Sequence, residues 1–251
     1  TKGYKMDSNK ILNDWNRLVE YVDKHSTGEQ NKNIHKMLTH FEDRFIDAPA
    51  SSRPNHHNCF VGGLLDHTLR VIDTSLKVKQ MFKLLGVTVK AEDSEVVFGA
   101  MFHDLGKIGD LNEPYYINQT DEWRRNKLNE WYTFNDKLEP LSVTDRALWL
   151  LQHFDIKISQ EVWKAIKMSD GLFDEGNISL YRKHDTDNIL HYIVHFADWM
   201  STVAEKQLYK QSTDTNEESD QPATLKTPKA KAKVDPKIER LKDQFNDLFP
   251  S

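Results

Sequence analysis

The segment 96–110, with the sequence VVFGAMFHDLGKIGD, constrains this chain more than any other stretch. Apolar residues at helical spacing run directly into His103 and Asp104, and a glycine-rich turn follows. An imidazole and a carboxylate at the end of an apolar helix cost free energy to bury unless a partner satisfies both groups. A divalent cation would satisfy them together, because both are common metal ligands. A solvated helix C-terminus before a glycine is the alternative interpretation.

Composition limits the class of protein. A chain of 251 residues can bury a large helical core. Its formal net charge of -5 gives no overall attraction for nucleic acid or an anionic membrane. The single cysteine, Cys59, excludes an internal disulfide and a cysteine-based zinc site, and it fits a reducing compartment. No signal-like apolar core and no run of about 20 apolar residues occurs, so we expect a cytoplasmic protein without a membrane span.

Apolar periodicity predicts an all-α fold. Helices are expected around 11–22 and 34–45, and a loop with two prolines is expected over 47–58. Gly62 and Gly63 then permit a close backbone approach before a helix that contains His67. A histidine inside such a helix is more often a hydrogen-bonded core residue than a ligand, so His67 alone does not establish a site.

Four fragments nevertheless follow one another in order. APAS at 48–51, HHN-x3-GGLLDHT at 56–68 and FHDLGK at 102–107 precede HFADWMS at 195–201, which places Asp198 on an apolar helix. Together they resemble the H…HD…D signature of the HD-domain metal-dependent phosphohydrolases over more than half of the chain. The resemblance implies an HD-domain helical bundle. It also implies a nucleotidase or dNTP phosphohydrolase that cleaves a nucleotide phosphoester with metal-activated water.

The resemblance also implies one metal site. Its ligands would be His67, His103, Asp104 and Asp198, and they leave positions open for water and a phosphate oxygen on an octahedral ion. The expected cofactor is one divalent transition metal (Mn, Fe, Co, Ni or Zn), with Mg as the alternative. Two departures favour a single ion: Val143 and Ser169 stand where relatives with two metals carry histidines. These missing histidines also disfavour a dinuclear iron oxygenase.

Alternatives to this register remain open. His153 and His184 lie nearby in the sequence and could supply ligands instead. A second metal held by Asp170 and substrate phosphates is a further option.

Other residues are assigned roles by the same resemblance. Asp104 and Lys107 are expected to be catalytic, with Lys107 holding a phosphate by charge unless it is a solvated surface lysine. His195, one turn before Asp198, would orient a ligand, protonate a leaving group or serve a structural role. The predicted substrate-binding residues are His56, His57, Asn58, Lys107, Arg124, Arg125 and Asp170.

The segment 111–136 is rich in aromatic and polar residues and predicts a short hairpin or lid. Its aromatic rings and arginines could stack a base and hold phosphate, or they could cover an edge of the core.

The sequence divides into four predicted parts. Residues 1–46 form a helical extension packed on the core, and 47–210 form the phosphohydrolase core. A polar stretch with two prolines over 211–235 predicts a disordered linker, and 236–251 predicts an amphipathic helix. That helix would dock on its own domain or on a protein partner.

Three functions are compatible with these observations. A nucleotide is the expected substrate, because a nuclease would ideally carry a basic track and this chain is acidic. The first alternative is a 3′-5′ exonuclease on RNA or DNA, with nucleic acid as the partner. The second is a catalytically silent protein that binds nucleotide or acts as a scaffold.

Overall fold

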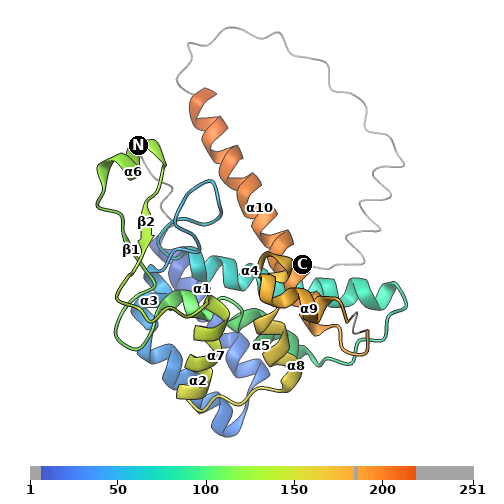
Figure 1. Cartoon of the computed structure of the whole chain (residues 1–251). Helices are drawn as coiled ribbons and strands as arrows, with labels where there is room; N and C mark the ends of the chain where they lie inside the picture. The colour runs from blue at the N-terminus through green and yellow to red at the C-terminus, as the bar shows by residue number, and fades with distance from the viewer. Residues whose placement is uncertain (1–6, 184–185, 219–251) are drawn as a thin grey trace, which may run out of the picture. The chain divides into compact units, whose positions relative to one another are not determined.

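The computed structural model describes residues 7–183 and 186–218, with side chains up to residue 212. This part of the chain contains ten α-helices and one two-stranded sheet, so the predicted all-α class is confirmed (Figure 1). The helices are α1 Ser8–His25, α2 Gly28–His40, α3 Glu42–Asp47, α4 Gly63–Leu84, α5 Asp93–Phe102, α6 Glu122–Lys127, α7 Val143–His153, α8 Gln160–Lys167, α9 Ile178–Tyr181 and α10 Leu190–Glu218. The strands are β1 Tyr116–Asn118 and β2 Tyr132–Phe134.

The chain divides into two compact units, 1–213 and 214–251. All elements from α1 to α9 belong to the first unit. The predicted linker was expected to begin at residue 211, but α10 continues to Glu218. Extending an existing helix costs less than starting one, so the helix continues through polar residues past the last apolar position. The remainder of the predicted linker and the predicted helix 236–251 lie outside the described residues.

The core forms where α4 packs against α1 and α5, and α5 packs against α8. Every residue of α5 from Val96 to Phe102 is buried, as the apolar run in the sequence requires. The N-terminal helices α1 and α2 bury Leu18, Val22 and Ile34 in the same cluster. The helix that ends at His103 is therefore surrounded by other helices and is not a solvated surface helix.

The start of α4 depends on the two adjacent glycines. Gly62 has a φ of 80°, a left-handed conformation that favours glycine. A Cβ atom on Gly63 would lie 2.0 Å from the carbonyl oxygen of Asn58. The predicted close backbone approach is confirmed, and it brings the 47–58 loop against the first turn of the helix that carries His67.

The hairpin predicted within 111–136 is present. Strands β1 and β2 pair antiparallel, with Tyr116 opposite Phe134 and Asn118 opposite Tyr132, and α6 lies between them in the chain. The rings of Tyr116 and Phe134 stack with their centroids 5.6 Å apart. Aromatic cross-strand pairs of this kind stabilise a short hairpin that has little other support.

Arg44 on α3 ties the base of the hairpin to the helical core. Its guanidinium donates to the carbonyl oxygens of Asp110 and Glu113, the latter at 3.0 Å. These carbonyl groups follow Lys107 closely in the chain. Arg44 therefore holds the backbone segment that comes after the His103-Asp104 turn.

No helix in the described part of the chain has the length and apolar character that a membrane crossing requires.

We predict that Arg44→Met lowers the free energy of unfolding by about 2 kcal/mol, because partly buried carbonyls lose a charged donor. Urea unfolding followed by circular dichroism measures the change. Arg125→Met is the matched control, since Arg125 is exposed on α6. Equal stability of the two variants would contradict the anchoring role of Arg44.

Candidate metal centre

The four predicted ligands converge from three segments of the chain. His67 comes from α4, His103 and Asp104 follow α5, and Asp198 comes from α10. Nε2 of His67 lies 3.1 Å from Oδ1 of Asp198 and 3.6 Å from Oδ2 of Asp104. Nε2 of His103 lies 3.5 Å from the same Asp104 oxygen and 3.8 Å from Oδ1 of Asp198.

Local structure explains how Asp104 and Asp198 reach this point. The backbone leaves the α-helical conformation at Asp104, where φ is -107°, and a short 3₁₀ helix Leu105–Ile108 follows. This change of direction turns the carboxylate back toward the end of α5. Asp198 follows Ala197, which is fully buried, and shares its side of α10 with Ser201 and Glu205.

The imidazole nitrogens that face the centre lack hydrogen bonds. Nε2 of His67 and Nε2 of His103 are both buried without a hydrogen-bond partner among the described residues, although carboxylate oxygens lie within 3.1–3.8 Å. The imidazole nitrogens and the carboxylate oxygens therefore face the same small space. Buried polar atoms normally find a partner, and such an arrangement is expected of ligands around a cation.

The opposite ring nitrogens are already bound. Nδ1 of His103 donates to the carbonyl oxygen of Ala100 at 2.7 Å. Nδ1 of His67 lies 3.1 Å from both carboxylate oxygens of Glu205. A proton held at Nδ1 leaves a lone pair at Nε2, which is the form of histidine that binds a metal.

The spacing of the ligand atoms also suits a metal ion. Ligand atoms of His67, His103 and Asp198 all lie within 4.8 Å of one another. Cis ligands of an octahedral ion with metal–ligand distances of about 2.1 Å are about 3 Å apart. The donor set of two imidazoles and two carboxylates fits Mn, Fe, Co, Ni or Zn. It fits Mg less well, because Mg prefers oxygen ligands to imidazole nitrogens.

Charges around Asp104 keep it ionised. Burial alone would raise the pKa of the Asp104 carboxyl, but Lys107, His103 and His67 hold it well below its usual range. Nζ of Lys107 donates to Oδ2 of Asp104 at 2.6 Å, and 14% of the Lys107 side chain is exposed. Burial would lower the pKa of Lys107, but Asp104 raises it above its ordinary value, so the ammonium stays charged.

His67 shows the same competition. Burial would lower its pKa, but Glu205 and Asp198 raise it to about 10. Without a cation the buried carboxylates thus retain a proton on this imidazole, and metal binding would displace it.

Glu205 is the residue of the site that sequence reasoning missed. It is 2% exposed and holds His67 from the side opposite Asp198, while Nε of Arg70 lies 3.2 Å from its Oε1. The signal was available in the helix period, because residues 198 and 205 are two turns apart on one face. Glu205 stands in a polar stretch of the sequence, so only its position on the same helix face as Asp198 indicates that its carboxylate is buried.

His57 adds a third imidazole beside His67. The two ring centroids are 4.9 Å apart, and Nε2 of His57 is buried without a hydrogen-bond partner among the described residues. Burial and the neighbouring His67 lower the pKa of His57 to about 2, so it stays neutral. His57, His67 and Glu205 form a second group with metal-ligand spacing, but Glu205 already engages Nδ1 of His67.

Asp170 and His195 lie together at another edge of the site. The Asp170 carboxyl is exposed, yet partial desolvation and the carboxylates of Asp104 and Asp198 raise its pKa. Nδ1 of His195 donates to the carbonyl oxygen of Ser169 at 2.8 Å. Neither His195 nor Asp104 is among the described groups with metal-ligand spacing, but Oδ2 of Asp104 lies 3.5–3.6 Å from Nε2 of His67 and Nε2 of His103.

The structure does not bring the remaining predicted residues to the four ligands. His56 is exposed, and Nδ2 of Asn58 donates to Asp66 at 2.9 Å, so Asn58 supports the loop. Arg124 and Arg125 lie on α6, where Arg124 pairs with Glu130 at 3.3 Å.

The structure also shows the surroundings of Ser169, Val143 and His153. Ser169 donates to the carbonyl oxygen of Ile166 at 2.9 Å, and Val143 is the first residue of α7. His153 is exposed at the end of α7, beside the ring of Trp149. His184 lies outside the described residues.

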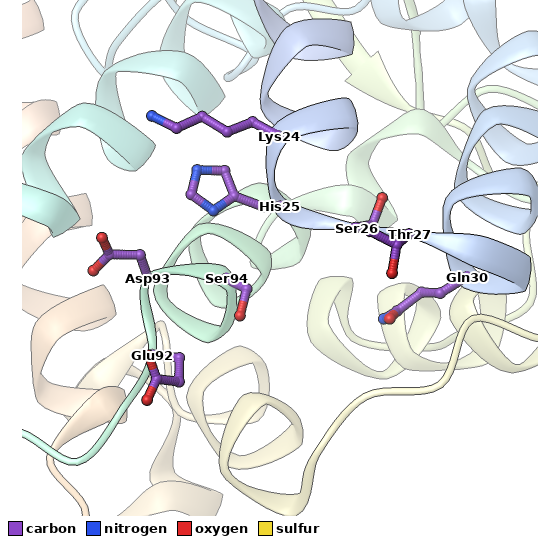
Figure 2. Close-up of a pocket in the computed structure, with 8 residues that line it drawn as sticks. All are labelled: Lys24, His25, Ser26, Thr27, Gln30, Glu92, Asp93 and Ser94. Carbon is purple, nitrogen blue, oxygen red and sulfur yellow. The ribbon is translucent and has the colours of Figure 1, made fainter.

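A separate polar pocket of about 370 Å³ lies between the end of α1, the start of α2 and the start of α5 (Figure 2). Figure 2 shows the side chains of His25 and Asp93 on one side of this pocket and Gln30 on the other. Nζ of Lys79 already binds Asp93 at 2.6 Å. Neither the four candidate ligands nor Lys107 lines this pocket, so it shares no residue with the metal centre.

No protein-family model matches the chain, and no solved structure matches it.

We predict that Glu205→Gln weakens Mn²⁺ binding by about 10- to 100-fold, because His67 loses the anion that orients it as a ligand. Calorimetric titration of the metal-free protein with MnCl₂ measures the affinity, and circular dichroism checks the fold. Glu161→Gln on α8 is the control. Unchanged affinity in Glu205→Gln would mean that Glu205 serves Arg70 alone.

Proposed function

We propose that the chain is an HD-domain type, metal-dependent phosphohydrolase that cleaves the phosphoester of a nucleotide. One observation carries the proposal. Two histidines and two aspartates, in the order H…HD…D along the chain, face one position with unpartnered imidazole nitrogens. A lysine bound to one of these aspartates lies beside them.

When bound, a divalent cation would supply Lewis acidity toward a phosphoryl oxygen and lower the pKa of water. His67, His103, Asp104 and Asp198 would hold it. Lys107 carries a fixed positive charge beside them, where it can offset negative charge that develops on a phosphoryl group.

His195 is the proposed proton carrier. Its Nδ1 is engaged by the Ser169 carbonyl oxygen, so Nε2 is the atom that can take or give a proton. The exposed carboxyl of Asp170 borders the same side and would contact the substrate or its leaving group.

A small nucleotide is favoured over a polynucleotide. The chain carries a net charge of -5, and the exposed arginines of α6 are not gathered at the metal centre. A nuclease would need a basic path for several phosphates. The exonuclease and the silent nucleotide-binding protein remain outcomes that the following experiment separates.

The decisive experiment starts with elemental analysis of protein purified without added metal. The protein is then incubated with nucleoside mono- and triphosphates and, in parallel, with end-labelled RNA and DNA. We expect one transition-metal ion per chain and release of phosphate from a nucleotide. Cleavage confined to the oligonucleotides would support the exonuclease, and nucleotide binding without any hydrolysis would support the silent protein.

We predict that Asp104→Ala abolishes both metal binding and hydrolysis, since it removes a ligand that also positions Lys107. Metal content and phosphate release are measured on the same preparation. Asp136→Ala, at an exposed position after the hairpin, should change neither. Hydrolysis that survives in Asp104→Ala with metal still bound would refute the ligand set.

We predict a different result for Lys107→Met. Metal should still bind, because all four ligands remain, while kcat falls about 10²- to 10³-fold with the loss of charge stabilisation. Lys127→Met, exposed on α6, is the control. An unchanged kcat would show that Lys107 only neutralises Asp104.

A further inference from the structure

A second pocket shares Lys107 with the metal centre. It has a volume of about 580 Å³, within the range typical of small-molecule sites. One wall comes from the hairpin, with Tyr115, Tyr116 and Tyr132, and the opposite wall comes from the end of α3 and the loop after it. Lys107 lines this pocket and also donates to Asp104, so one side chain connects the pocket with the ligands proposed to hold the cation.

The hairpin wall is aromatic. The ring centroids of Tyr115 and Tyr116 are 4.9 Å apart, and those of Tyr116 and Tyr132 are 6.4 Å apart. All three side chains are half-buried, so part of each ring remains accessible. Tyrosine rings pack well against planar heteroaromatic rings, and their hydroxyl groups can also form hydrogen bonds.

The pocket lining carries groups of opposite charge. Lys107 is its cation that does not bind backbone carbonyl oxygens. Asp43 and Asp47 line the α3 side, where they are one helical turn apart and exposed. Arg44 also lines this side, but its guanidinium is engaged by the carbonyl oxygens of the 108–113 segment. A ligand with an anionic group at Lys107 and hydrogen-bond donors toward α3 would match this arrangement.

We propose that this pocket binds the nucleoside part of the substrate, with the base against the hairpin tyrosines and the phosphate beside Lys107. The inference rests on the proposed function, because the phosphoester must reach the metal centre. The hydroxyl and amino groups of the nucleoside donate to Asp43 and Asp47. These carboxylates repel further phosphates, so the site takes a single nucleotide and not the body of a polynucleotide.

Aromatic packing is what distinguishes a nucleoside from a simple phosphorylated sugar here. The test compares kcat/KM for adenosine, cytidine, guanosine and uridine 5′-monophosphates with that for ribose 5-phosphate, in which a hydroxyl group replaces the base. For the wild type we expect the best nucleotide to exceed ribose 5-phosphate by about tenfold or more, the usual effect of stacking one base on an aromatic ring. In Tyr132→Leu this ratio should fall about tenfold.

Two further variants complete the design. Trp123→Leu removes an aromatic ring of α6 that is 61% exposed and does not line the pocket, so it should keep the wild-type ratio. Asp47→Asn removes one acceptor charge while keeping the shape, and it should reduce the preference among the bases that carry amino groups. Because Asp47 lies on α3 and not in the hairpin, Asp47→Asn keeps the test valid if Tyr132→Leu weakens the hairpin.

Binding of a nucleoside, which has no phosphoester to hydrolyse, tests the pocket separately from the proposed function. Adenosine is titrated into wild type, Tyr132→Leu and Trp123→Leu by calorimetry. If no phosphoester is hydrolysed but adenosine binds to wild type and not to Tyr132→Leu, the proposed function fails and the pocket stands. If ribose 5-phosphate and the nucleotides are hydrolysed with equal kcat/KM, and Tyr132→Leu leaves that ratio unchanged, the pocket assignment is overturned while the hydrolase stands.

Discussion

The site depends first on the contacts of His67. One nitrogen faces Asp198 and the other faces Glu205, so a single imidazole on α4 joins two turns of α10. All three groups lie inside or at the edge of a helical core, where an uncompensated charge costs several kcal/mol. Their positions are therefore narrowly determined: moving α10 by one turn relative to α4 would leave a buried carboxylate and a buried imidazole without partners. The same contact sets which nitrogen of His67 is free for a cation.

The surrounding groups extend this arrangement toward the surface. His103 is oriented by the Ala100 carbonyl oxygen, and Asp104 is oriented by Lys107. Arg44 then fixes the backbone that follows Lys107 and supports the hairpin. The candidate metal centre and the tyrosine-lined pocket thus share one short segment, 103–108, whose direction is set by interactions on both sides. Positioning by a second layer of partners is what a preorganised site requires.

Much of this architecture can be predicted from local sequence. Helical periodicity places His103 at the end of a buried helix and Asp198 on a helix with an apolar stripe, and both placements agree with the structure. The turn at Gly62 and the hairpin within 111–136 also follow from neighbouring residues. Local prediction was wrong at residue 211, where the end of the helix depends on propagation along polar residues and not on an apolar pattern. The role of Asn58 in substrate binding, which the resemblance implies, stays a prediction, and the structure shows only that its amide nitrogen donates to Asp66.

The sequence by itself determined the helical class, the order of the histidines and aspartates, and the break in the chain after Asp104, because these depend on residues within a few positions of one another. Only the tertiary structure decided that Glu205 orients His67, that His57 packs against the same ring, and that tyrosines of the hairpin line the same pocket as Lys107. Each of those contacts joins residues whose separation in the chain carries no periodic signal. Which of these residues come into contact is determined by how the helices pack around a common core. Burial of apolar surface is non-directional, so no single residue in the sequence indicates its distant partner.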